Sequence, residues 1–347
     1  MSGALISVIV IFDRGRFEPC LTSLLAQEGM NFEIIAVVPD ETAALGVPRH
    51  GRVQTLSISD RNPARRRNLA AARARGQYLA FIDDDAFAPP DWLRKGVGRL
   101  EGGPGLAGVG GPNLIPEGAG FSERVTDMVL TTRLIGAGSR AYSKRGTAAP
   151  AKPGEVHLVN FLVRREWFER VRGFNEEIGY GGEDTEFVLL AAKQGGRFVF
   201  DPELWVFHRR RRFGWSYFGQ RFKLRAQSAR LFIAYPSVYI TNAGFLFALI
   251  GFPLLAALAI ALFVLKSAAG IAALAGLYVA ACLALSWRRW RRRPLLALIA
   301  PWAFFAHHAV NLAGLWWGLA GALVSGPWRV RRKLRSSRSS LRDSEID

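Results

Sequence analysis

The chain has 347 residues, a formal net charge of +18 and 50% hydrophobic residues. Its carboxylates are unevenly distributed, because after Glu203 no Asp or Glu occurs until Asp343. Arg and Lys continue through that stretch in clusters between long apolar runs, a pattern that suits a membrane with an anionic inner surface. Nucleic-acid binding does not explain the charge, since the Arg clusters flank apolar runs too long for a soluble domain.

The cysteines and the N-terminal residues indicate in which cellular compartment the globular part lies. Cys20 and Cys282 lie in regions of different character, so no disulfide framework is implied and the globular part is expected to be cytosolic. Residues 1–12 lack a basic segment and a cleavage site, so they are predicted to be a first strand and not a signal peptide.

Strand and helix patterns alternate through the first 208 residues. Apolar runs predict strands at 5–12, 32–38, 53–58, 78–82, 156–163, 197–200 and 204–207. Helical patterns cover 17–27, 64–75, 165–171 and 183–194, and a further helix follows Asp91. Residues 102–120 are predicted to be loop, or a strand with close backbone approach, and 136–154 a flexible loop. The alternation predicts a doubly wound α/β sheet with helices on both faces.

Three consecutive carboxylates, Asp83, Asp84 and Asp85, follow the apolar run 78–82. In an extended backbone, side chains two residues apart point the same way, so Asp83 and Asp85 are predicted to face one side and Asp84 the other. Two carboxylates at the carboxyl end of a parallel strand make a site for a hard divalent cation, and ligands of open α/β sheets collect there. A solvated acidic loop is the alternative interpretation.

A second acidic group begins the helix predicted at 183–194. Glu183 and Asp184 follow Gly181 and Gly182. The exposed N–H groups of a helix N-terminus favour ionised carboxylates, and a general base must be deprotonated at neutral pH. Simple complementation of the helix dipole is the alternative interpretation of this motif.

Beyond residue 208 the chain changes character. Residues 209–236 combine Arg and aromatic side chains without a carboxylate, which predicts helices in the membrane interface, with a solvated basic linker as the alternative. The apolar runs 238–265 and 267–286 are each long enough to span a bilayer, which takes ~20 residues. The predicted domains are therefore 1–208 (catalytic), 209–236 (interfacial helices), 237–326 (membrane region) and 327–347 (basic tail).

The third apolar run, 295–325, makes the number of membrane crossings, and so the side of the C-terminal tail, uncertain from the sequence. Two spans would return the Arg-rich loop 288–293 to the cytosol, in agreement with the positive-inside tendency. A third full span would place the basic tail on the opposite side. We therefore expect this run to form a re-entrant or in-plane hairpin hinged near Pro301, His307 and His308. The other possibility is a tail that lies outside despite its charge.

Several short motifs occur together in a fixed order. They are Ser7–Val10, Glu33–Val38, Arg67 with Asn68, Phe81–Asp85 and Gly182–Asp184. The chain resembles a family 2 glycosyltransferase with the GT-A fold over roughly residues 5–208, and more loosely in the membrane part. Residues 160–165 and 173–176 are similar to the family's acceptor-side segment. The resemblance implies a GT-A-like doubly wound mixed sheet, followed by interfacial helices and an all-α transmembrane region.

The resemblance also implies a donor site. Asp40 would contact the nucleotide base, and Asp83 and Asp84 would lie on the nucleotide-sugar side. One of the three consecutive arginines would add charge near the diphosphate, with Arg67 as the candidate beside Arg65 and Arg66.

The metal and the chemistry follow from the same resemblance. Asp85, with Asp83, would ligate Mn²⁺ or Mg²⁺. His208 matches a position where related transferases supply a further metal ligand, although an interfacial histidine beside four arginines is the alternative. Asp184 would deprotonate the acceptor hydroxyl, supported by Glu183, in a displacement that inverts the anomeric centre.

The membrane part bears on the acceptor. Residues 220–225 depart from the Gln-x-x-Arg-Trp pattern of processive synthases, and the spans are too few for an export channel. We therefore expect one sugar to be moved from a nucleotide-sugar to a lipid-linked acceptor of the polyprenyl phosphate or diphosphate type. The predicted location is the cytoplasmic leaflet of a bacterial inner membrane, with a multi-pass anchor and a cytoplasmic catalytic domain. The residues expected to hold the acceptor phosphate are Arg209, Arg212, Gln220 and Arg221.

Three other functions remain open at this point. A processive polysaccharide synthase is one. A nucleotide-sugar-binding protein without catalysis is another, and a basic membrane scaffold is the third. The intact carboxylates of the two acidic motifs disfavour the binding protein, because a degenerate site should lose carboxylates first. The scaffold would leave the ordered acidic motifs unexplained.

Overall fold

The computed structural model describes residues 4–13, 18–103, 105–132, 140–178, 181–240 and 243–326. The chain divides into two compact units. Within the described residues, the first unit comprises 4–117 and 140–209, and the second comprises 118–132 and 210–326. The predicted basic tail, 327–347, lies outside the described residues. Residues 118–132 were predicted within the first domain but belong to the second unit.

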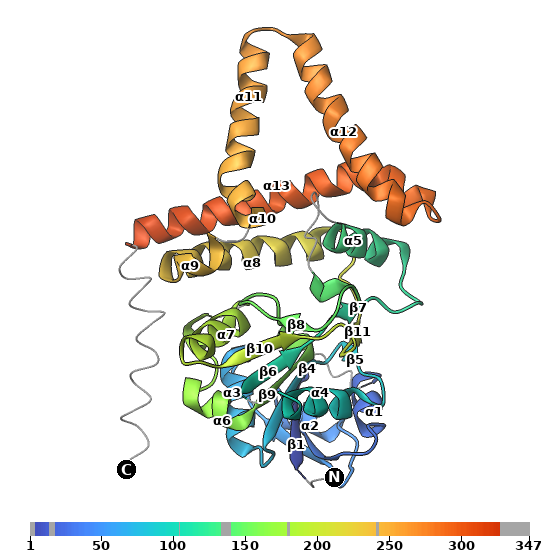
Figure 1. Cartoon of the computed structure of the whole chain (residues 1–347), viewed down its shortest axis with the longest axis vertical. Coiled ribbons are helices and arrows are strands. Elements are labelled where there is room, and N and C mark those ends of the chain that lie inside the picture. The colour runs from blue at the N-terminus through green and yellow to red at the C-terminus, as the bar shows by residue number, and fades with distance from the viewer. Residues whose placement is uncertain are drawn as a thin grey trace. The chain divides into compact units, whose positions relative to one another are not determined.

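An eight-stranded mixed sheet organises the first unit (Figure 1). Its strand order is β3 (Val53–Ser57), β2 (Asn31–Val38), β1 (Leu5–Ile11), β4 (Tyr78–Asp83), β9 (Phe161–Arg164), β6 (Leu106–Gly110), β10 (Arg197–Phe200) and β8 (Ala149–Pro150). The strands β3, β2, β1 and β4 are parallel, whereas β9 is antiparallel to both of its neighbours. The predicted doubly wound mixed sheet is confirmed.

Helices cover both faces of this sheet, because the β1 side chains alternate between two cores. Ile6, Val8 and Val10 pack with α1 (Cys20–Leu25) and α4 (Trp92–Glu101). Ile9 and Ile11 pack on the other face with three further helices. These are α3 (Pro63–Arg73), α6 (Arg165–Val171) and α7 (Glu183–Lys193). A short helix, α2 (Glu41–Leu45), follows β2.

A small second sheet extends the carboxyl edge of the main one. It orders β5 (Ala86–Phe87), β11 (Val206–His208) and β7 (Asn113–Leu114). The turn before β7 needs glycine, because a Cβ on Gly111 would lie 1.7 Å from the backbone oxygen of Leu204. The Gly/Pro-rich segment is thus strand with close backbone approach, the second of the two predicted alternatives.

Most predicted elements occur near their expected positions, with two differences. The strand predicted at 156–163 is only Phe161–Arg164, preceded by the 3₁₀ turn Leu158–Asn160. Of the segment predicted as a flexible loop, the described part contains the turn Arg140–Tyr142 and strand β8. The start of the helix predicted at 17–27 lies outside the described residues, and α1 begins at Cys20.

The second unit is all helical. It contains α5 (Phe121–Thr131), α8 (Trp215–Ala234), α9 (Pro236–Tyr239), α10 (Ala243–Leu246), α11 (Phe252–Val264), α12 (Ala268–Trp290) and α13 (Pro294–Ser325). A π-helical turn, Phe247–Gly251, joins α10 to α11. Two stretches in it are long and apolar enough to cross a membrane, Ala268–Trp287 and Pro294–Ser325, and Ala248–Val264 is a shorter apolar helix. These stretches agree with membrane association.

The hinge predicted in the third apolar run is wrong. Residues 294–325 form one continuous helix that passes through Pro301 and both histidines. The polar side chains that suggested a turn are instead used in packing, since His307 contacts Tyr217 of α8 at 2.7 Å. An interior proline removes one backbone hydrogen bond and crowds the carbonyl four residues before it, and packing against neighbouring helices compensates for this at Pro301.

Candidate active site

The acidic strand and His208 converge at the carboxyl edge of the sheet. Asp83 ends β4 opposite Ile11 of β1. His208 ends β11 opposite Ala86, the residue that follows Asp85. One ligand atom each from Asp83, Asp85 and His208 lies within 4.8 Å of the others, and His208 Nε2 is 3.0 Å from Asp85 Oδ1. The predicted convergence of the two carboxylates is therefore observed, and the histidine joins them.

Asp84 turns to a different partner, as the alternation of side chains predicts. Its Oδ2 accepts a hydrogen bond of 3.2 Å from the backbone N–H of Asp13. Burial and the neighbouring carboxylates raise the pKa of Asp84 to about 6, more than this bond lowers it. Asp13 in turn pairs with Arg66, a buried guanidinium that also donates to the Val37 carbonyl at 3.3 Å. This pair fixes the backbone that follows β1.

Arg67 connects the two acidic motifs. One guanidinium nitrogen lies 3.2 Å from Asp83 Oδ1 and the other 3.0 Å from Glu183 Oε1. The Arg67 side chain is 12% exposed and Glu183 6%, so water screens this interaction weakly. Among the three consecutive arginines, Arg67 alone makes both contacts in the described structure, since Arg65 pairs with Asp60 and Glu176.

Glu183 and Asp184 begin α7 after two glycines with positive φ, Gly181 and Gly182. Burial raises the pKa of Glu183 to about 7, against the lowering effect of Arg67. Among the described residues its Oε2 atom is buried without a hydrogen-bond partner. Burial likewise raises the pKa of Asp184, although its Oδ1 accepts a bond of 2.7 Å from the Thr185 N–H. Desolvation therefore outweighs the expected preference of the helix N-terminus for ionised carboxylates.

Asp40 has a local structural role. It follows β2 and is the N-cap of α2, with its Oδ1 accepting a hydrogen bond of 2.8 Å from the Ala43 N–H. The side chain is exposed. Its contact with a nucleotide base stays a prediction.

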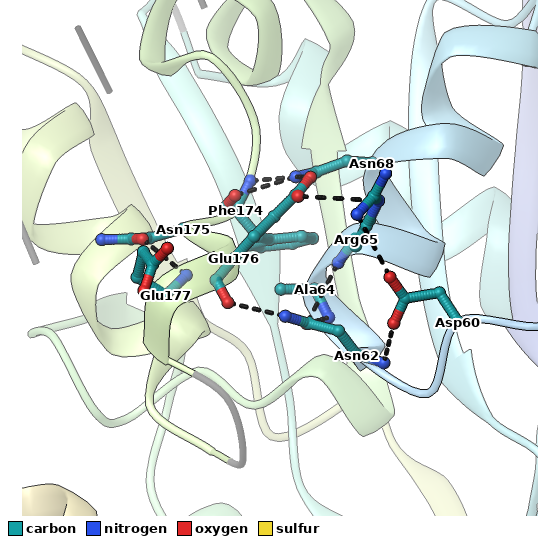
Figure 2. A network of polar contacts seen from close by, with 9 residues as sticks. All are labelled: Asp60, Asn62, Ala64, Arg65, Asn68, Phe174, Asn175, Glu176 and Glu177. Atoms are coloured by element: carbon teal, nitrogen blue, oxygen red, sulfur yellow. Dashed lines mark hydrogen bonds and ion pairs between the residues drawn. The ribbon is translucent and has the colours of Figure 1, made fainter. Parts of the chain in front are cut away.

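A polar network joins α3 to the turn that precedes α7 (Figure 2). The Asn68 amide donates to the Phe174 carbonyl and accepts from the Phe174 N–H, both at 2.8 Å. The same amide nitrogen lies 3.0 Å from Glu176 Oε1. Asn62 caps α3 and donates to the Glu176 carbonyl at 2.6 Å. Because Arg67 lies on α3 as well, the network fixes the position of Arg67 relative to the start of α7.

The same turn is also tied to α7 itself. Asn175 donates to Glu186 Oε1 at 2.9 Å, and both side chains are buried. Gly173 has a φ of 66°, and a Cβ there would lie 2.6 Å from Asn68 Oδ1. The close fit leaves no room for a side chain at this position.

The residues expected to bind the acceptor phosphate are divided between the units. Arg209 belongs to the first unit, and Arg212, Gln220 and Arg221 belong to the second. Gln220 and Arg221 lie on α8, whereas Arg212 precedes it. Their common role stays a prediction.

Two carboxylates and one imidazole suit a divalent cation. The donor set of Asp83, Asp85 and His208 therefore fits the predicted divalent metal.

The sheet order, the acidic strand end and the facing helix N-terminus define the GT-A class of transferase folds. The sequence model described as "Glycosyl transferase family group 2" matches residues 78–324. The chain therefore belongs to this family, and its first unit has the GT-A fold.

Curated proteins agree with this membership. The chain is 25% identical over 197 residues to the succinoglycan biosynthesis protein ExoO of Rhizobium meliloti, covering 54% of this chain and 55% of that protein. It is 25% identical over 203 residues to the uncharacterized glycosyltransferase EpsJ of Bacillus subtilis, covering 55% and 56%. The chain thus spans about half the length of these relatives.

A solved structure shares the fold over most of the chain. The mannosyltransferase PcManGT from Pyrobaculum calidifontis, in complex with GDP-Man and Mn²⁺, superimposes with a TM-score of 0.60 at 22% identity. The match covers 88% of this chain and 86% of that one. At this identity the likeness concerns the fold.

The raised pKa of Glu183 predicts a specific pH dependence of stability. Between its ordinary value near 4.5 and about 7, the folded state holds a proton that the unfolded state has released. The free energy of unfolding should therefore fall as pH rises through this window. Glu183→Gln should remove that loss and gain about 3 kcal/mol on the wild type by pH 8, at ~1.4 kcal/mol per pKa unit.

Chemical denaturation of the detergent-solubilised protein between pH 4.5 and 8 measures this difference. Asp84 remains in both proteins, and the difference between the two profiles reports Glu183 together with its neighbour Asp184. Parallel profiles for the two proteins would show that Glu183 is ionised in the folded state throughout.

Asn68 should control the order of the turn before α7. Asn68→Ala leaves the Phe174 N–H without its side-chain acceptor, at a cost of about 1–3 kcal/mol. Hydrogen exchange in residues 173–178 should accelerate. Arg73→Ala, an exposed site on the same helix, is the matched control and should leave exchange there unchanged. Equal protection in both variants would contradict the role assigned to Asn68.

Proposed function

We propose that the chain is a membrane-bound inverting glycosyltransferase that moves one sugar from a nucleotide-sugar to a lipid-linked acceptor. The observation that carries this proposal is the double ion pair of Arg67, which holds the acidic strand end and the start of α7 together. A donor site and a base for the acceptor hydroxyl must lie this close for a direct displacement. Membership of the glycosyl transferase family group 2 supports the reaction class.

The donor would bind at the carboxyl edge of the sheet. Asp83, Asp85 and His208 would hold Mn²⁺ or Mg²⁺, which neutralises the charge of a leaving nucleoside diphosphate when bound. Asp84 and Asp40 would contact the nucleoside side of the donor. Arg67 lies beside Asp83 and would add positive charge there.

The base would be one of the two carboxylates at the start of α7. In the reaction, the base takes the proton of the acceptor hydroxyl while that oxygen forms a bond to the anomeric carbon. The bond from that carbon to the diphosphate oxygen breaks, with inversion. A base whose pKa lies near the working pH is the most effective. The pKa of Glu183 is about 7, but its side chain is buried and paired with Arg67. Asp184 is half-buried, so we assign Asp184 as the base and Glu183 as its support.

The acceptor assignment rests on charge and on the apolar helices. Arg209, Arg212, Gln220 and Arg221 supply donors for a phosphate or diphosphate group, and a polyprenyl chain would remain in the bilayer. We place the protein in a bacterial inner membrane, multi-pass, with its catalytic domain on the cytoplasmic side. The relative ExoO is named for succinoglycan biosynthesis, which supports a place in polysaccharide assembly.

Two other functions remain distinguishable by experiment. A processive synthase would release long products from a single acceptor, whereas a single transfer lengthens the acceptor by one sugar. A non-catalytic nucleotide-sugar-binding scaffold would bind donor without turnover.

Asp184→Asn should reduce transfer to a lipid-linked acceptor by about 10²–10⁴-fold, because the hydroxyl proton loses its acceptor. Donor binding, measured on the same preparation, should change little. Glu166→Gln is the matched control, since Glu166 is an exposed acid in the first turn of α6. Unchanged transfer by Asp184→Asn would remove Asp184 from the mechanism, and transfer to water-soluble oligosaccharides at equal rates would remove the lipid-linked acceptor.

A further inference from the structure

Helix α13 has two faces of different character along its whole length. Its first half packs Leu296, Ala300 and Phe304 against α5 and α12. Its second half packs on α8. The opposite face is an exposed apolar stripe, defined here as Leu298, Trp302, Phe305, Trp316 and Leu323. Residues three, four or seven apart lie on one side of a helix, and eleven residues are about three turns, so the stripe is continuous from end to end.

Polar contacts hold the covered face of α13 on α8. His307 Nδ1 lies 2.7 Å from the Tyr217 hydroxyl, and Asn311 accepts a bond of 2.8 Å from Arg225 Nε. These groups are buried or half-buried, so separating the helices would leave them without partners.

The backbones of α8 and α13 are also in direct contact. A Cβ on Gly314 would lie 2.4 Å from the Phe222 carbonyl oxygen, and one on Gly318 would lie 2.3 Å from that of Ala226. Small residues four apart allow such close approach of two helices. Helices α8 and α13 therefore form one packed pair and must occupy the same region of the membrane.

Helix α8 is unsuited to the bilayer core. It carries Arg221, Lys223, Arg225 and Arg230 and contains no carboxylate that could neutralise them. Lys223 and Arg230 are exposed. Cations at the centre of a bilayer are among the costliest groups to insert, whereas at the surface they meet anionic headgroups.

Helix α12 shows the contrasting pattern of a helix that is surrounded by lipid. In its apolar stretch only 6% of the residues are buried, against 39% in α13. Together α11 and α12 form a hairpin that projects away from the layer of α8 and α13 (Figure 1). A helix of 32 residues is about 48 Å long, well beyond the ~30 Å hydrocarbon core.

We propose that α13 lies in the plane of the membrane surface and does not cross the bilayer. Its exposed apolar stripe is buried among the lipids at the boundary of headgroups and acyl chains, where Trp residues concentrate. Helix α8 lies on its aqueous side, with its cations toward anionic headgroups. Of the described helices only the α11–α12 hairpin enters the core, so this part of the chain crosses twice. This inference does not depend on the transferase activity.

Depth measurements in liposomes that contain phosphatidylglycerol test the proposal. Spin labels are placed on Leu298→Cys, Ala309→Cys and Leu323→Cys, and their accessibility to oxygen and to a water-soluble nickel complex is compared. The in-plane arrangement predicts one common depth. A spanning helix would place Ala309 deeper than both ends by on the order of 10 Å, given a rise of 1.5 Å per residue. The native cysteines are buried, and the parent protein labelled in parallel gives the background.

Sidedness provides a second test with a separate readout. Ser216→Cys on α8 and Ser325→Cys at the end of α13 replace exposed residues with close isosteres. In sealed vesicles, an impermeant thiol reagent should reach both or neither, because both lie on one side of the membrane. Labelling of only one of the two would overturn the proposal.

Discussion

The arrangement of the site depends on one guanidinium. Arg67 contacts Asp83 at the end of β4 and Glu183 at the start of α7, and its side chain is only 12% exposed to solvent. Without this cation, the ionised forms of Asp83 and Glu183 would face each other with no positive charge between them. Removing one partner of a buried pair leaves an uncompensated charge, so the two acidic motifs depend on Arg67 together.

The fold supplies the position of that guanidinium. Parallel strands β1 and β4 bring their carboxyl ends to one edge, and α3 begins beside that edge with its cap Asn62 tied to the Glu176 carbonyl. Asn68 then fixes the turn that leads into α7. The unusual pKa of Glu183 follows from this packing, since burial outweighs both the arginine and the helix N-terminus.

Local sequence patterns predicted much of this architecture, but they could not predict which residues far apart in the sequence contact each other. The alternation at Asp83, Asp84 and Asp85 predicted their directions because a strand has a fixed period of two. The choice of Arg67 among three arginines, and the pairing of Asn68 with Phe174, needed the tertiary structure. Helix α5 was missed between the Gly/Pro-rich segment 102–120 and the loop predicted at 136–154, although Val125, Met128 and Val129 show helical spacing. Pro301 and two histidines suggested a hinge in α13 because the tertiary partners of this segment, such as Tyr217 of α8 for His307, could not be foreseen.

The most direct test of the central claim is nucleotide binding by the purified protein. Calorimetric titration with UDP, GDP and dTDP, in Mn²⁺, Mg²⁺ or EDTA, would compare the wild type with Asp85→Asn. We predict that one nucleotide binds only when the metal is present, and that the variant loses this binding. Absence of binding under every condition, or equal binding in EDTA and by the variant, would contradict a metal-dependent donor site at the end of β4.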